Sequence, residues 1–196
     1  PLEGLSKFLQ SRSAENYAHV SIEELPALLR AINSYPHAKD VRIGLRLLSL
    51  LASRPSEIRE ARWSEIDLSK KLWTIPAERM KRRREHVVPL SRQAIEALTE
   101  LRTLTGAYPL LFPGRKDRTT PRSNTVFLMA LRRLGYAGRQ TGHGFRHIAS
   151  TILNEQGFDE NHIEAQLSHA KEGIAGVYNK AVYLPQRRVM MQWYAD

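Results

Sequence analysis

The sequence predicts a mainly α-helical domain that carries one small antiparallel β-sheet, an α+β fold. The chain has 196 residues with 42% hydrophobic content, which suits one good-sized core. Apolar residues recur at helical spacing behind N-capping residues along most of the chain. Two segments of β-forming residues, "LWTI" at 72–75 and "HVVPL" at 86–90, flank a basic connection and predict a hairpin whose cationic loop projects outward.

The first helices are predicted from local signals. "SIEE" offers a capping box of Ser21 with Glu24, followed by leucines at helical spacing. Asp40 is placed to cap a second helix, whose nearly all-round apolar character indicates burial. The dipeptide Arg54-Pro55 ends that helix and starts another, because proline suits the first helical turn.

Five more helices are predicted after the hairpin. Ser91 and Ser123 cap the first two, and the third follows "GHG" at 142–144. Asp159 caps the fourth, and a last amphipathic helix covers about 185–194.

The domain organisation follows from composition. Residues 1–20 hold one short apolar cluster in a polar setting, so we expect a linker or the end of an upstream module there and one domain over 21–196. Cysteine is absent, which excludes disulfide frameworks, thiolate metal sites and cysteine nucleophiles. No run of about 18 apolar residues and no leader pattern is present, so we expect a cytoplasmic protein without a membrane partner.

The charge indicates a polyanionic partner. Thirty Lys+Arg against twenty Asp+Glu give a net charge of +10 and a pI near 10.1. Five cations lie in "RMKRRR" at 79–84 and four in "GRKDRTTPR" at 114–122. One such run is as often a solvated face, but two runs and the overall excess favour nucleic acid. The predicted DNA-contacting cations are Arg79, Arg82, Arg83, Arg84, Arg115, Lys116, Arg118 and Arg122.

The segment "GHGFRH" at 142–147 allows a metal site or a phosphate site. His143 and His147 lie four apart, the spacing that places two imidazoles on one helical face, and His169 could be a third ligand. A zinc-hydrolase helix requires a carboxylate directly after its first histidine, where this chain has glycine, and Arg146 would oppose a dication. We therefore predict no metal.

Phosphate chemistry suits the same segment better. The planar fork of Arg146 can meet two phosphate oxygens with charge-assisted hydrogen bonds, and an imidazole can donate a hydrogen bond or shuttle a proton. His143 and Arg146 lie three apart at a helix N-terminus, where the helix dipole favours an anion. Taken alone, the segment could equally be structural or a surface feature.

Other segments strengthen the phosphate hypothesis and carry a family resemblance. In order along the chain they are "RPSE" with "ARWSEID", "WTIPAERMK" with "HVVPLS", "HGFRHIASTILNEQG", "IEAQLSHA" and "VYNKAVYL". Over about residues 20–196 this set resembles the catalytic domain of the tyrosine recombinases, and most closely the prophage-type integrases of bacteria. The chain departs from the pattern at Ser168, where many relatives have glycine, and in lacking the N-terminal DNA-binding modules of such enzymes.

The resemblance implies a phosphate-binding cage. In such a cage Arg54 and Arg146 bind the scissile phosphate, and His143 and His169 complete it. Glu57 would support the cage from behind these side chains.

The resemblance also implies how the strand is cut. Tyr178 would attack the phosphorus to give a 3′-phosphotyrosine link, and Lys81 would protonate the leaving 5′ oxygen. Tyr183 is the rival nucleophile, and any of the cations at 79–84 could instead be a mere phosphate contact. A covalent intermediate keeps the energy of the ester bond, so rejoining needs no nucleotide, metal or other cofactor.

We therefore expect site-specific integration or excision of a mobile element in the bacterial cytoplasm, on the nucleoid. The partners would be double-stranded DNA at an attachment site and other recombinase protomers. The apolar side chains of the last helix, Met190, Met191 and Trp193, would allow its exchange between protomers. Two alternatives remain open: a catalytically inactive DNA-binding module, and a monomeric nicking or relaxing enzyme of the type IB kind.

Overall fold

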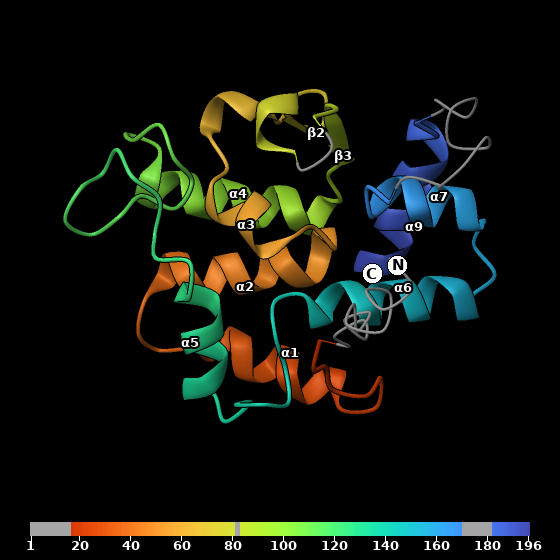
Figure 1. Cartoon of the computed structure of the whole chain (residues 1–196), viewed down its shortest axis with the longest axis horizontal. Coiled ribbons are helices and arrows are strands. Elements are labelled where there is room, and N and C mark those ends of the chain that lie inside the picture. Colours follow the sequence, from red (N-terminus) through yellow and green to blue (C-terminus); the bar gives the residue numbers. More distant parts are fainter. Residues whose placement is uncertain (1–16, 81–82, 170–181) are drawn as a thin grey trace, which may run out of the picture.

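The computed structural model describes residues 17–80, 83–169 and 182–196, in which helices form most of the fold and one small sheet lies at its edge (Figure 1). The helices are α1 (Leu25–Asn33), α2 (Lys39–Leu51), α3 (Pro55–Arg59), α4 (Arg92–Thr105), α5 (Val126–Arg133), α6 (Gly144–Glu155), α7 (Glu160–Gln166) and α9 (Leu184–Ala195). The strands are β1 (Ile66–Asp67), β2 (Leu72–Ile75) and β3 (His86–Pro89), with 3-10 turns at η2 (Trp63–Glu65) and η3 (Ala77–Arg79). The predicted fold class is confirmed.

The helix α2 lies at the centre of the molecule. It packs against α1, α3, α4, α5, α6 and α9, and Figure 1 shows it between α1 and α4. Its isoleucine and leucine side chains at positions 43, 45, 47 and 48 are almost completely buried. The predicted burial of this helix on nearly all sides is therefore confirmed, as expected for an element that is apolar all round.

The three strands form an antiparallel sheet in the order β1-β2-β3. In the predicted hairpin, Trp73 lies opposite Val88 and Ile75 lies opposite His86. These four side chains are buried, so one face of the sheet is directed to the core. The strand β1 pairs only two residues with β2, and a strand this short leaves no pattern from which it could have been predicted.

Two predicted caps are confirmed, and the hydrogen bonds of a third form just before its helix. Ser21 and Glu24 exchange the 3.3 Å side-chain-to-backbone hydrogen bonds of a capping box, but Glu24 rather than Ser21 is the N-cap of α1. Ser91 accepts a backbone N–H of α4 at 3.3 Å, and Asp159 accepts one of α7 at 2.7 Å. Each cap satisfies a donor that the first helical turn leaves without an intrahelical partner.

Two predicted caps are wrong. Ala38 is the N-cap of α2, and Asp40 lies inside the first turn, where its carboxylate accepts a hydrogen bond from Arg122 Nε at 2.9 Å. This partner is 82 residues away, so no local pattern indicates it. Thr125 is the N-cap of α5, and the Ser123 hydroxyl accepts the Thr125 backbone N–H at 3.4 Å instead of capping the helix.

Two clusters of buried apolar side chains stabilise the fold. The larger one contains most of the buried side chains of α1, α2, α4, α5 and the sheet. The smaller one joins the ends of α2 and α7 to α6 and α9, and it includes Met190 and Met191 of α9. Phe145 of α6 belongs to the larger cluster and Leu153 to the smaller, so α6 connects the two.

In the described parts of the chain, no helix combines the length and the apolar character needed to cross a bilayer.

Candidate active site

The start of α3 fixes the position of Arg54. Arg54 is the N-cap residue, and its backbone N–H donates to the Glu57 carboxylate at 2.8 Å. Its guanidinium Nη1 donates to the other oxygen of the same carboxylate at 2.6 Å. Glu57 is only 6% exposed, so this carboxylate orients the Arg54 guanidinium from the protein side and leaves its outer edge accessible.

The start of α6 lies directly against the start of α3. A Cβ atom added at Gly142 would lie 2.6 Å from Pro55 Cγ, so only glycine allows this approach. His143 is the next residue and the N-cap of α6, and Arg146 is in its first turn. The packing of Gly142 on Pro55 therefore brings the segment "GHGFRH" beside Arg54.

Arg146 ties three segments together. Its side chain is buried, and Nη1 donates to the Ala52 carbonyl at 2.6 Å. Its Nη2 donates to the Leu167 carbonyl at 2.7 Å and lies 3.0 Å from His169 Nε2. The guanidinium of α6 thus contacts the residue after α2 and the residues after α7 at the same time.

The contacts of His169 indicate its tautomer. A guanidinium only donates, so Nε2 accepts from Arg146 and the neutral ring carries its proton on Nδ1. The Nδ1 atom lies 3.2 Å from a carboxylate oxygen of Glu164, which accepts this proton's hydrogen bond. His169 is 47% exposed at its side chain, so the ring is held by two partners and still faces solvent.

Burial and like charges act on the titrating groups of this site. Burial, followed by Arg146 and Arg54, lowers the pKa of His143 below its ordinary value. Burial, followed by Arg54, lowers the pKa of Arg146 to about 10, while Glu57 opposes this shift. Burial and the nearby His19 lower the pKa of His147. At neutral pH the site therefore combines two cationic guanidiniums with a neutral His143 ring.

This arrangement suits an oxyanion with several acceptor oxygens. Two arginines that repel each other are held in place by Glu57 and by backbone carbonyls, and an incoming anion would relieve this repulsion. Arg54, His143, Arg146 and His169 come from three segments that are far apart in the sequence, with His143 and Arg146 both at the start of α6. The structure brings these four predicted residues and Glu57 into one region.

Three predicted residues, Lys81, Arg82 and Tyr178, lie outside the described residues. Tyr183, the rival nucleophile, is the N-cap of α9 with φ of 45°. The centroid of its ring lies 4.9 Å from that of His162.

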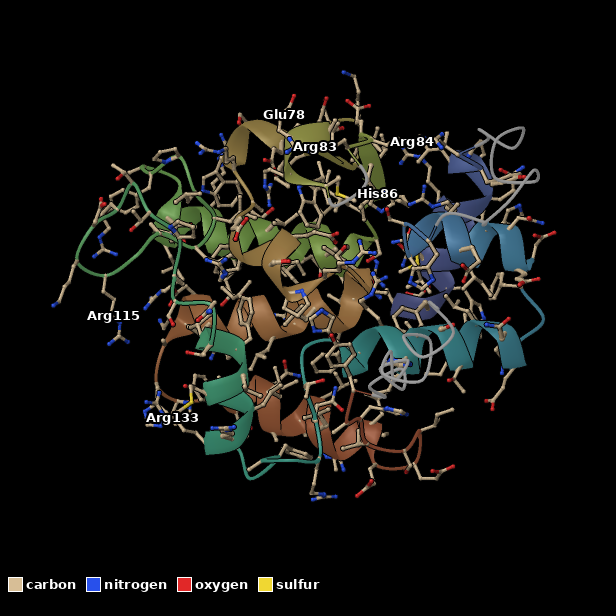
Figure 2. The ribbon with its side chains drawn as sticks, viewed as in Figure 1. Glu78, Arg83, Arg84, His86, Arg115 and Arg133 are labelled. Carbon is tan, nitrogen blue, oxygen red and sulfur yellow. The ribbon has the colours of Figure 1, made fainter. Side chains whose placement is uncertain are left out.

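Two of the predicted DNA-contacting arginines are used inside the protein. Arg79 donates to the Glu65 carboxylate at 2.6 Å and to the Glu57 carbonyl at 2.6 Å. Arg122 pairs with Asp40, and both side chains are largely buried. The other predicted cations that the structure describes are exposed: Arg83, Arg84, Arg115, Lys116 and Arg118. Figure 2 shows Arg83 and Arg84 at the end of the sheet and Arg115 on the loop between α4 and α5.

A buried polar network beside the cage had no sequence signal. Arg187 of α9 is 1% exposed, and its Nη2 donates to Gln166 Oε1 at 2.7 Å and to the Val87 carbonyl at 2.8 Å. Gln166 Nε2 donates to the Leu51 carbonyl at 3.0 Å, and His86 Nε2 lies 3.2 Å from the Gln166 carbonyl. This network connects α9 and β3 to the ends of α2 and α7, next to the carbonyls that hold Arg146.

Two of the three histidines considered as metal ligands have aromatic neighbours. His143 stacks on Tyr17 with ring centroids 4.3 Å apart, and His147 stacks on His19 at 5.4 Å. Within the described ranges, no three histidine, aspartate or glutamate side chains gather in a way that could hold a metal ion.

Comparisons with known proteins identify the family and the fold of the chain. Residues 19–183 match the model of the phage integrase family. The prophage integrase IntZ of Escherichia coli strain K12 is 46% identical over 198 residues, which cover 100% of this chain and 48% of IntZ.

The crystal structure of XerA recombinase superposes with a TM-score of 0.64 at 17% identity, covering 91% of this chain and 66% of XerA. A lambda integrase dimer bound to a COC′ core site gives a TM-score of 0.63 at 16% identity, covering 97% of this chain and 63% of that structure's chain. The chain thus spans about half the length of the curated relatives that it matches.

Proposed function

Because the chain belongs to the phage integrase family, we propose that it is the catalytic domain of an enzyme that cuts and rejoins DNA strands at a specific site. The observation that carries this proposal is the convergence of Arg54, His143, Arg146 and His169 on one region, with Glu57 behind Arg54. The reaction would integrate or excise a mobile element through a transient 3′-phosphotyrosine link.

The proposed chemistry assigns one task to each side chain. Arg54 and Arg146 would hold the non-bridging oxygens of the scissile phosphate, with His143 and His169 as hydrogen-bonding partners. The Tyr178 oxygen would bond to phosphorus while the bond to the 5′ oxygen breaks, and Lys81 would give that oxygen a proton. Rejoining reverses these steps, so the energy of the ester bond is retained and no nucleotide is consumed.

The nucleophile needs electrostatic help. A phenol with a pKa of about 10 is ionised in roughly one molecule in a thousand at pH 7. Two guanidiniums beside the phosphate would stabilise both the phenolate and the charge that develops in the transition state.

The proposed partners are double-stranded DNA and further protomers. The exposed cations at the end of the sheet and between α4 and α5 support a DNA-facing surface, and the lambda integrase neighbour was solved as a DNA-bound dimer. In the structure α9 packs on its own domain through Met190 and Met191. We propose that this helix moves to a neighbouring protomer on DNA, which would take place on the bacterial nucleoid.

A nicked suicide duplex that carries the attachment sequence tests the proposal. The protein should form a covalent adduct, and it should yield exchanged strands when a partner duplex is added. A Tyr178→Phe variant should form no adduct, whereas Tyr183→Phe should retain it. DNA binding without any adduct would indicate an inactive DNA-binding module, and nicking without exchange would indicate a relaxing enzyme. An adduct that persists in Tyr178→Phe would overturn the assigned nucleophile.

A further inference from the structure

The chain enters the domain across the start of α6. Residues 17–20, here named the strap, precede α1 and lie against the segment that carries His143. Within the strap, Tyr17 stacks on His143 with ring centroids 4.3 Å apart and planes inclined by 16°. The distance and the small angle give a close stacked contact between two π systems.

The strap is anchored independently of this stack. The Thr141 backbone N–H and hydroxyl both donate to the Ala18 carbonyl, at 3.0 and 3.2 Å. The Val20 N–H donates to Gln140 Oε1 at 2.9 Å, and the Gln140 side chain is completely buried. The strap is therefore held by backbone hydrogen bonds to residues just before α6.

Gly144 allows the close approach of the strap. A Cβ atom at this position would lie 2.6 Å from the Ala18 carbonyl oxygen and 2.9 Å from His19 Cβ. Because the first of these contacts is with backbone, a larger residue would push the strap away from α6. The close packing of the strap therefore explains why residue 144 is glycine.

The orientation of the His143 ring depends on the strap. No described residue makes a hydrogen bond to this ring, in contrast to His169, which is held by Arg146 and Glu164. The charged and titrating groups that face His143 are Arg54 and Glu57 from α3 and Arg146 and His147 from α6. None of these four fixes the plane of the imidazole, and the ring of Tyr17 lies parallel to it.

We propose that Tyr17 is a positioning residue, which fixes the plane of the His143 imidazole for the phosphate and shields one of its faces from water. The proposed role of His143 in the phosphate cage is the premise of this inference. The exposure of Tyr17 fits such a role, because its inner face covers the histidine while the outer face remains in solvent.

Three variants test the role of Tyr17. In Tyr17→Ala the stack is lost, and we expect adduct formation at saturating suicide DNA to fall about 10- to 100-fold, as for a catalytic group displaced by about an ångström. Tyr17→Phe retains the ring and should keep the wild-type rate. His19→Ala is the matched control, since it removes the other stacked ring of the strap, which covers His147 rather than His143.

A titration measures the same contact without DNA. Burial is the first cause of the lowered pKa of His143, so exposing the ring should raise that pKa towards its ordinary value in Tyr17→Ala. The His143 imidazole signals in an NMR titration should shift in this direction in Tyr17→Ala and stay in place in Tyr17→Phe. A merely structural role would lower the melting temperature without moving this titration.

Three results would overturn the proposed role of Tyr17. Unchanged rate and titration in Tyr17→Ala would exclude positioning, and equal defects in Tyr17→Phe and Tyr17→Ala would assign the effect to the hydroxyl. A weaker DNA affinity with an unchanged saturated rate and titration would make Tyr17 a DNA contact. If the wild-type protein forms no adduct at all, the proposed function fails, and the NMR titration still decides whether Tyr17 holds His143.

Discussion

Arg146 shows how a buried cation can be kept ready for an anion. A guanidinium has five N–H donors, and the contacts to Ala52, Leu167 and His169 use three of them. The remaining donors are available to a phosphate. Because backbone carbonyls rather than a carboxylate hold this arginine, its charge is not cancelled by an ion pair.

Substitution of Arg54 tests the proposed phosphate-binding cage directly. Replacing it with alanine removes one oriented donor, so adduct formation should slow by about 10²–10³ at saturating DNA. The control is Arg62→Ala, which removes an exposed arginine from the segment after α3 and should leave that rate close to wild type. Single-turnover assays with the suicide duplex measure both, and an Arg54→Ala rate within threefold of wild type would contradict the assigned role.

His86 should make stability depend on pH. Burial, followed by Arg187, lowers the pKa of this histidine from 6.5 to about 3 in the folded protein. Between these values the unfolded chain binds a proton that the folded protein does not, so stability is complete above pH 6.5 and falls as the pH decreases. The contribution is about 1.4 kcal/mol per pH unit.

The His86→Gln variant isolates this contribution. Its amide can still donate to the Gln166 carbonyl but does not titrate, so urea denaturation between pH 7 and pH 4 should show a shallower loss of stability than in the wild type. Parallel stability curves for the two proteins would exclude His86 as a source of the pH dependence.

At the scale of elements, the position of α9 depends on one buried arginine. Arg187 is surrounded by amide and carbonyl oxygens from three other segments, and burial lowers its pKa to about 10. Two of these oxygens belong to Val87 in β3 and to Gln166 at the end of α7. The docking of α9 and the position of the end of α7 are therefore linked through Gln166.

Substituting Arg187 should loosen both elements. Arg187→Met leaves buried acceptors without donors, and we expect a loss of about 3 kcal/mol in the free energy of unfolding. Arg188→Met is the matched control on the next, more exposed position and should change stability by about 0.5 kcal/mol or less. Urea denaturation gives the energies, and hydrogen exchange should show faster exchange in α7 and α9. Equal effects of the two variants would refute the link.

Local signals predicted most of the elements, and long-range contacts explain the failures. Ser91 and Asp159 cap helices by accepting from donors two or three residues away, a distance that a sequence pattern can show. The carboxylate of Asp40 and the guanidinium of Arg187 instead find partners that only the folded chain brings near. The full set of cage residues was identified by resemblance, because no periodicity connects the three separate segments that carry them.

For the molecule as a whole, net charge alone does not identify the surface proposed to face DNA. The chain carries a net charge of +10, yet Arg79 and Arg122 form ion pairs inside the protein with the largely buried Glu65 and Asp40. The exposed basic loops are the better candidates for phosphate contacts. Sequence counts therefore overestimate the number of cations available to DNA.

DNA affinity should depend steeply on salt. If about 6–10 phosphates are contacted, the binding constant should fall by about 10³–10⁵ between 50 and 200 mM salt. Arg115→Ala should reduce the slope of log affinity against log salt by about one, whereas Arg122→Ala should mainly reduce stability by about 3–5 kcal/mol. Fluorescence anisotropy and urea denaturation separate the two effects. A flat salt response would contradict a phosphate-binding surface.

The helix α6 joins two apolar clusters of unequal size, and the cage lies where they meet. The smaller cluster has few members, so it can open while the larger one stays intact. We expect gentle warming to separate Arg146 from His169 while most of the helical content is preserved. Cooling should restore the geometry without refolding the rest of the chain, so heat would act on this site reversibly.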